Sequence, residues 1–128
     1  KFKESGIILL GPLNEVELVS EMLEADLFVH PSHTDNSPNS VCEAMLLGMP
    51  VISTFAGGIP AIVTDKEDGL LVQDGDPIAL AGAIYELNNN PEFAISLSQR
   101  ARAKAMMRHD PARVTQTLVG IYSEVLNN

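Results

Sequence analysis

The sequence predicts an α/β domain in which a parallel sheet of about four short strands is flanked by helices. Two patterns predict it: short, continuous apolar runs recur along the chain, and amphipathic helical segments separate them. The chain has 128 residues, of which 45% are hydrophobic and 20% are charged. This length and composition fit one globular domain, residues 1–128, and argue against a disordered or disulfide-based protein.

Four apolar runs are the predicted strands: residues 7–10, 27–30, 51–53 and 70–72. Glycine or proline ends the first two runs, as is typical where a strand gives way to a turn. Because the runs are continuous rather than alternating, we expect strands that are covered on both faces.

Capping residues and prolines mark the helices. Asn14 and Asp76 can each accept hydrogen bonds from the first amides of a helix, and Gly48 suits a left-handed C-cap. Prolines at helix starts fix φ near a helical value. The predicted helices are residues 14–24, residues 41–47, a helical turn at 60–63, a helix from 77, a helix from 91 and a last one over 111–126.

Charge is distributed unevenly along the chain, with a net value of −9. Residues 1–95 hold fifteen acids and three bases, whereas residues 96–128 hold two acids and five bases. The acidic balance disfavours a nucleic-acid partner, since Lys and Arg supply the affinity for phosphate backbones. The C-terminal bases either pair with the acidic remainder or attract an acidic surface or lipid headgroups. They are Arg100, Arg102, Lys104, Arg108 and Arg113.

The single cysteine, Cys42, cannot form an internal disulfide, which favours a reducing compartment. No apolar run approaches the roughly 18–20 residues that a membrane-spanning helix needs. We therefore expect a cytoplasmic protein, with peripheral attachment to a membrane surface as the alternative.

A polar loop and the helix after it hold the main candidate binding residues. Ligands of parallel α/β sheets sit beyond the carboxyl ends of the strands, and residues 31–40 follow such an end. Asp35 and Glu43 are separated by seven residues, and the amides around Ser40 and Val41 open the helix. Free amides suit a phosphate, and a carboxylate beside them can accept two hydrogen bonds from a sugar diol. The spacing also allows a structural interpretation, in which Asp35 forms an Asx-turn and Glu43 caps the helix.

A glycine pair and two histidines are further candidates with weaker signals. Gly57 and Gly58 follow the third predicted strand and allow close backbone approach to a ligand, although a tight turn explains them too. They form neither a G-x-G-x-x-G fingerprint nor a P-loop. His30 and His33 are either structural donors or catalytic groups, and neither has zinc-site spacing with Cys42.

Further motifs occur in a fixed order along almost the whole chain, about residues 6–127. They are Gly11, Ala25-Asp26-Leu27-Phe28-Val29, Pro31-Ser32, Glu43-Ala44-Met45, Gly48-Met49-Pro50-Val51-Ile52, Gly57-Gly58-Ile59-Pro60, Gly69-Leu70-Leu71-Val72, Asp76 and Leu80-Ala81. In this order the chain resembles the C-terminal nucleotide-sugar-binding domain of retaining GT-B glycosyltransferases, the "glycosyl transferases group 1" family. The resemblance implies a Rossmann-like sheet, of which this chain is an incomplete half.

The resemblance also implies roles for the two acids. The family carries a Glu, seven residues and a second Glu; the second matches Glu43, which would bind the ribose hydroxyls of the donor. The first matches Asp35, a shorter acid, which would contact the transferred sugar or stabilise the reacting centre. The implied reaction transfers a sugar with retention from a nucleoside diphosphate sugar, UDP- or GDP-linked, to a sugar or lipid-linked acceptor. It requires no metal and no other cofactor.

The rest of the donor would contact main-chain groups. The amides of Asn39, Ser40 and Val41 would hold the diphosphate, and the segment Gly11-Pro12-Leu13 would flank the base.

Two parts of the family's pattern are missing from the sequence. One is a pair of earlier strands with an Arg and a Lys that neutralise the diphosphate, and the other is the N-terminal acceptor domain. The bases available before residue 96 are Lys1, Lys3 and Lys66. We therefore expect a partial C-terminal domain that is inactive alone.

The implied strand order, 3-2-1-4-5-6, has a structural consequence. Residues 7–10 would be strand 3 and would leave residues 27–30 with an open edge. We expect residues 7–10 to move onto that edge, or two chains to pair or swap elements there.

Two other functions stay open. The chain can be a non-catalytic interaction module on the same fold, which uses its acidic face or its basic helices. It can also belong to a nucleotide-sugar epimerase of GT-B architecture, which would release product without an acceptor. An NAD-dependent dehydrogenase is disfavoured because the glycine fingerprint is missing.

Overall fold

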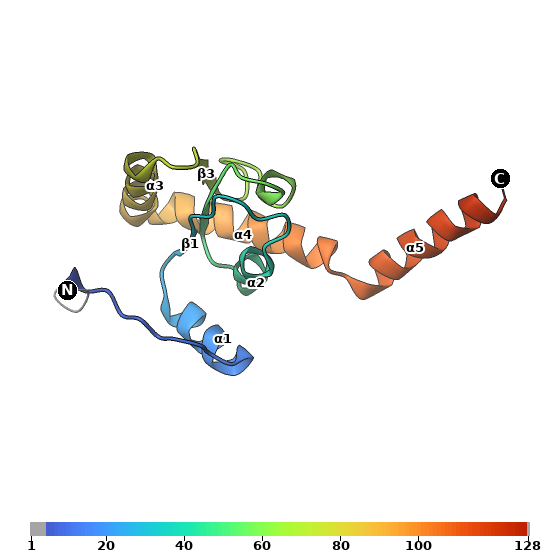
Figure 1. Ribbon diagram of the computed structural model, residues 1–128, viewed down its shortest axis with the longest axis horizontal. Helices are drawn as coiled ribbons and strands as arrows, with labels where there is room; N and C mark the ends of the chain where they lie inside the picture. Colours follow the sequence, from blue (N-terminus) through green and yellow to red (C-terminus); the bar gives the residue numbers. More distant parts are fainter. Residues whose placement is uncertain (1–4, 128) are drawn as a thin grey trace.

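The computed structural model describes residues 5–127 and confirms the α/β class (Figure 1). Three short parallel strands form one sheet in the order β1-β2-β3. They are β1 (Phe28–His30), β2 (Val51–Thr54) and β3 (Leu70–Val72). Val29 pairs with Ile52, and Ser53 pairs with Leu71. This order agrees with the one that the resemblance implies for its last three strands.

The helices follow the predicted caps closely. Asn14 forms a capping box with Glu17, Asp76 accepts from the first amides of its helix, and Gly48 has φ 79°. Two boundaries differ: the helix after β1 begins at Asn39 rather than at residue 41, and the helical turn predicted at 60–63 covers Ile59–Ala61. The helices are α1 (Glu15–Glu24), α2 (Asn39–Leu47), the 3₁₀ turn η2 (Ile59–Ala61), α3 (Pro77–Asn89), α4 (Pro91–Arg108) and α5 (Pro111–Leu126).

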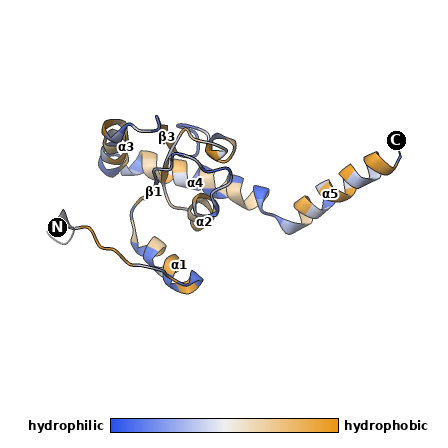
Figure 2. Cartoon of the chain, in the orientation of Figure 1, coloured by the Kyte–Doolittle hydropathy of each residue, from blue (hydrophilic) through white to orange (hydrophobic). Residues whose placement is uncertain are grey.

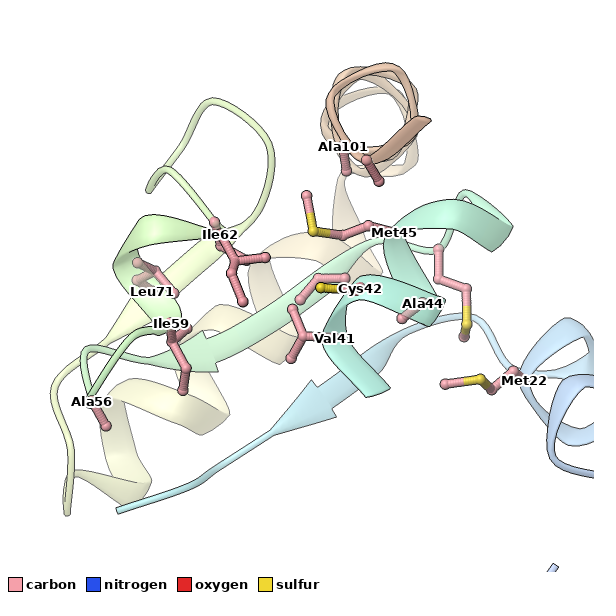
Figure 3. Packing of buried hydrophobic residues seen from close by; sticks show 14 residues of the cluster. Met22, Val41, Cys42, Ala44, Met45, Ala56, Ile59, Ile62, Leu71 and Ala101 are labelled. Carbon is pink, nitrogen blue, oxygen red and sulfur yellow. The ribbon is translucent and has the colours of Figure 1, made fainter. Parts of the chain in front are cut away.

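The sheet is covered on both faces, as the continuous apolar runs predict. Val51 and Leu71 belong to a cluster with α2, η2 and the C-terminal half of α4. Ile52 and Leu70 belong to a second cluster with α3 and the start of α4. Figure 3 shows the first cluster, in which Met45 of α2 lies beside Ala101 of α4. Helix α4 thus contributes to both layers of the core.

Residues 7–10 do not form a strand, so this part of the prediction was wrong. All four side chains are exposed, Ile8 by 79% and Leu9 by 77%. Within residues 5–127, β1 pairs with β2 alone, so residues 7–10 have not moved onto its open edge. An apolar run becomes a buried strand only where a neighbouring strand supplies hydrogen bonds and cover. The described chain offers this run neither.

The basic residues of α4 hold the segment between η2 and β3. Lys104 Nζ lies 2.6 Å from the buried Asp68 carboxylate and donates to Thr64 Oγ1. Arg108 donates to the carbonyl of Ala61, and Arg100 to the carbonyl of Glu67. The interpretation that the bases pair with the acidic remainder is therefore confirmed for Lys104, whereas Arg100 and Arg108 bind main-chain carbonyl groups.

Helix α5 extends away from the sheet and its helices (Figure 1). None of its residues is buried, although apolar side chains recur along it (Figure 2). No helix within residues 5–127 combines the length and the apolar character that crossing a membrane requires.

Candidate functional site

The carboxyl ends of the three strands lie at one edge of the sheet, and the candidate residues follow these ends. A small cavity of about 170 Å³ opens there, between the loops after β1, β2 and β3. Pro31, Thr54 and Gly75 are among the residues that line it. Asp35 and Glu43 are not among its described lining residues, so they lie outside this cavity.

The end of β2 anchors the loop after β1. Ser53 Oγ donates to the carbonyl of His30 at 2.8 Å, and Thr54 Oγ1 donates to the carbonyl of Ser32 at 2.5 Å. The amide of Gly58 donates to the carbonyl of Asp35 at 2.9 Å. Ser53 and Thr54 are the polar end of a strand that begins with two apolar residues, and this change from apolar to polar residues is the feature of the sequence that indicates a bonding role for their hydroxyls. Main-chain groups of the loop are thus fixed to the neighbouring strand.

The glycine pair lies directly against this loop. A Cβ atom on Gly57 would lie 2.3 Å from the carbonyl oxygen of Asp35. A Cβ atom on Gly58 would lie 1.9 Å from the carbonyl oxygen of Asn36. Any side chain here would collide with main-chain atoms. The close approach that the structure shows is to the backbone that carries Asp35, while the predicted approach to a ligand stays a prediction.

The carboxylate of Asp35 contacts both the loop and the strand before it. Its Oδ1 accepts from the amide of Ser37 at 3.1 Å, so the predicted Asx-turn is present. Its Oδ2 lies 3.3 Å from Nε2 of His30. The side chain is 30% exposed, which leaves it accessible to a ligand.

The start of α2 combines unpaired amides with an uncommitted acid. The first helical bond runs from the Cys42 amide to Pro38, whose side chain cannot cap the helix. The amides before it have no acceptor in the helix: Asn39, Ser40 and Val41. Glu43 lies in the second turn, so the alternative that it caps the helix is wrong. Its side chain is exposed and forms no hydrogen bond or ion pair within the described residues.

The segment Gly11-Pro12-Leu13 is not brought to this site. Gly11 and Pro12 are exposed and precede α1. Figure 1 shows this segment below α1, away from the loop that follows β1. Five candidate residues therefore lie together in the loop after β1 and the start of α2: Asp35, Asn39, Ser40, Val41 and Glu43. The three candidates expected to flank the base, Gly11-Pro12-Leu13, lie apart from them.

A contact that the sequence did not reveal ties the loop to the turn after β3. Nδ1 of His33 lies 2.6 Å from Oδ1 of Asp74. His33 was one of two ambiguous histidines, and Asp74 had only the signal of an ordinary turn residue before Gly75. The two residues are 41 positions apart, and no spacing rule joins them.

Positive charge is scarce around this edge. Lys66, the one base in residues 5–95, is exposed on the turn before β3. Lys1 and Lys3 lie outside the described residues. The site therefore offers amides and carboxylates, while three of the four bases of α4 are engaged by η2 and the segment that follows it: Arg100, Lys104 and Arg108.

Cys42 is a packing residue of α2. Burial raises the pKa of its thiol above the ordinary value, and the neighbouring Arg108 only partly offsets this. The thiol is therefore protonated at neutral pH, which makes it a poor nucleophile.

Comparisons with known proteins agree with this arrangement. The sequence pattern of the family described as "Glycosyl transferases group 1" matches residues 1–90. The D-inositol 3-phosphate glycosyltransferase of Saccharomonospora viridis is 34% identical over 117 residues, which are 91% of this chain and 27% of that protein. The chain thus spans about a quarter of the length of this curated relative.

Two solved structures have the same fold over most of the chain. HepE of Anabaena, in complex with UDP, superposes with a TM-score of 0.76 and 28% identity over 81% of this chain and 29% of HepE. The C-terminal domain of the group 1 protein LpcC from Francisella tularensis has a TM-score of 0.71 and 24% identity over 85% of this chain and 58% of that domain. The chain therefore belongs to the "glycosyl transferases group 1" family and has the fold of part of a GT-B C-terminal domain.

Proposed function

We propose that this chain is the donor-binding part of a retaining glycosyltransferase, which transfers a sugar from a nucleoside diphosphate sugar to a sugar or lipid-linked acceptor. One observation carries the proposal: Glu43 is exposed and unpaired beside the open amides of α2, one loop away from the anchored Asp35. Crystals of HepE contain UDP in one case and UDP-glucose in another, which supports a UDP-linked donor over a GDP-linked one.

The amides at the start of α2 take the diphosphate. Asn39, Ser40 and Val41 present three N–H groups at the positive end of the helix dipole, an arrangement that favours phosphate oxygens. Asn39 is exposed and Ser40 is half-buried, whereas Val41 is buried as a whole residue, so its amide would have to become accessible when a donor binds.

Glu43 takes the ribose and Asp35 the transferred sugar. A carboxylate without internal partners can accept hydrogen bonds from both hydroxyls of a diol, and Glu43 is free in this way. The family has a glutamate at the position of Asp35. Asp35 keeps the negative charge, but its side chain is one methylene shorter. We retain Gly11-Pro12-Leu13 as the base-flanking segment, which would require it to approach α2 when a donor binds.

The isolated chain should not catalyse transfer. Two negative charges face a diphosphate here, and among the described residues neither Asp35 nor Glu43 forms an ion pair with a Lys or Arg that would offset the repulsion. We also propose that the open edge of β1 allows two copies of the chain to pair.

Ligand-observed NMR with UDP, GDP, ADP and NAD tests the donor assignment. We expect one nucleoside diphosphate to bind, and Glu43→Ala to abolish the binding. Glu86→Ala is the matched control, because Glu86 is also an exposed helical glutamate but lies on α3. Equal loss in both variants, or unchanged binding by Glu43→Ala, would contradict the ribose role. Sugar transfer by the purified chain would overturn its expected inactivity.

A further inference from the structure

His30 ends β1 directly beneath the loop that carries Asp35. Its carbonyl accepts from Ser53 Oγ, which fixes its backbone to β2. Its ring stacks against that of Phe28, with centroids 6.4 Å apart and an interplanar angle of 10°. The backbone of His30 is therefore fixed to β2, and its ring lies nearly parallel to that of Phe28.

The outer nitrogen of this ring has an unusual environment. Nε2 is sealed from solvent and forms no hydrogen bond with any described residue. Buried polar atoms in folded proteins nearly always have a partner, so the missing partner of Nε2 calls for an explanation. The polar atom within reach is Oδ2 of Asp35, at 3.3 Å.

Both the main chain and the carboxylate of Asp35 have neighbours. The amide of Gly58 donates to the main-chain carbonyl of Asp35. The amide of Ser37 donates to Oδ1 of the carboxylate, and Nε2 of His30 faces Oδ2. The Asx-turn restrains one oxygen but leaves the other to be oriented by its surroundings. The aspartate side chain is short and has few rotamers, so the group that faces Oδ2 influences the orientation of the carboxylate.

We propose that His30 is a positioning residue, whose Nε2 orients the Asp35 carboxylate toward the sugar of the donor. This inference rests on the proposed function, since it assumes that Asp35 meets the transferred sugar. It assigns a role that a packing residue could not perform: phenylalanine would preserve the stacking on Phe28 but would remove the nitrogen, whereas glutamine would keep an N–H group near the same place.

The test compares His30→Phe with His30→Gln, using UDP and UDP-glucose as separate probes in calorimetry. We expect His30→Phe to weaken UDP-glucose binding about tenfold, the size of the hydrogen bond to a charged group that the 3.3 Å contact would become once the sugar is bound, while UDP binding is unchanged. His30→Gln should bind both probes like the original chain. Asp35→Asn should show the same selective loss, and the double variant His30→Phe/Asp35→Asn should lose no more than either single variant.

A second readout needs no donor. Hydrogen exchange of the Ser37 amide reports whether the Asp35 carboxylate still occupies its place, and it should accelerate in His30→Phe but not in His30→Gln. Failure of the original chain to bind any nucleotide would sink the proposed function alone, and the Ser37 exchange would still decide about His30. If His30→Phe matches the original chain in exchange, or His30→Gln fails to rescue it, the positioning role is wrong.

Discussion

The loop after β1 and the segment before α1 are both expected to contact the donor, yet the structure holds them very differently. The loop is bound through its main chain by Thr54 and Gly58. Residues 7–12 are exposed throughout. The comparison teaches that a polar, turn-rich stretch is tied to the fold when neighbouring residues bind its backbone. An apolar stretch forms no strand when no neighbour pairs with it or covers it.

The largest expected effect comes from a substitution that forces Gly58 away from the loop after β1. Gly58→Ala places a methyl group against the carbonyl of Asn36, and main-chain atoms on both sides cannot yield cheaply. We expect a loss of about 2–3 kcal/mol in the free energy of unfolding. Urea denaturation measures it.

Gly82→Ala is the control for that experiment. Gly82 lies inside α3 and a Cβ atom there meets nothing within 4 Å. Alanine should stabilise this helix by about 0.5–1 kcal/mol. If Gly58→Ala is tolerated as well as Gly82→Ala, the close approach of the two loops is not what fixes Asp35.

Thiol accessibility should differ between the two regions by at least about tenfold in rate. Cys42 is buried and its raised pKa keeps it protonated, so iodoacetamide should modify it slowly at pH 8. A thiol introduced by Leu9→Cys in a Cys42→Ser chain should react at the rate of an unfolded peptide. Mass spectrometry follows both reactions. Rapid labelling of Cys42 in the folded chain would show that α2 opens readily.

The raised pKa of the Cys42 thiol also determines how the stability of the fold changes with pH. Because folding raises the pKa of the Cys42 thiol, its stabilising contribution is complete below the pKa of the unfolded chain. The contribution is lost as the pH rises through the higher folded value, hence above about pH 8.5. Cys42→Ser should therefore be less sensitive to alkaline pH, as judged by thermal unfolding at a series of pH values.

The smallest effect concerns self-association. β1 has three residues, so its open edge can form few hydrogen bonds with a second copy, and pairing should be weak. We expect the apparent mass to rise only at high protein concentration in analytical ultracentrifugation. If residues 7–10 are exchanged between copies, Leu9→Ser should abolish the rise. A constant monomer mass at every concentration would exclude both edge pairing and exchange.

What could be predicted from the sequence was local. The caps at Asn14, Asp76 and Gly48 depend on residues within one turn, and the structure has all three. The Asx-turn of Asp35 with Ser37 is equally local and was foreseen as an alternative.

What could not be predicted depends on segments far apart in the chain. The contact of His33 with Asp74 needs the carboxyl ends of β1 and β3 to lie near each other, which no spacing encodes. The exposure of residues 7–10 was missed for the converse reason, since their apolar pattern presumes a neighbour. The role of Gly57 and Gly58 required knowing that another loop's backbone passes within contact distance.

The anchoring of the loop after β1 through its main chain has a practical consequence for engineering the proposed donor specificity. Its fixed points are carbonyl groups, such as those of Ser32 and Asp35, which every amino acid supplies. The side chains of Asn36, Ser37 and Asn39 are exposed and bear none of that restraint. A mutant library randomised at these three positions should therefore sample new donor preferences on an unchanged scaffold, with Gly57 and Gly58 held constant throughout.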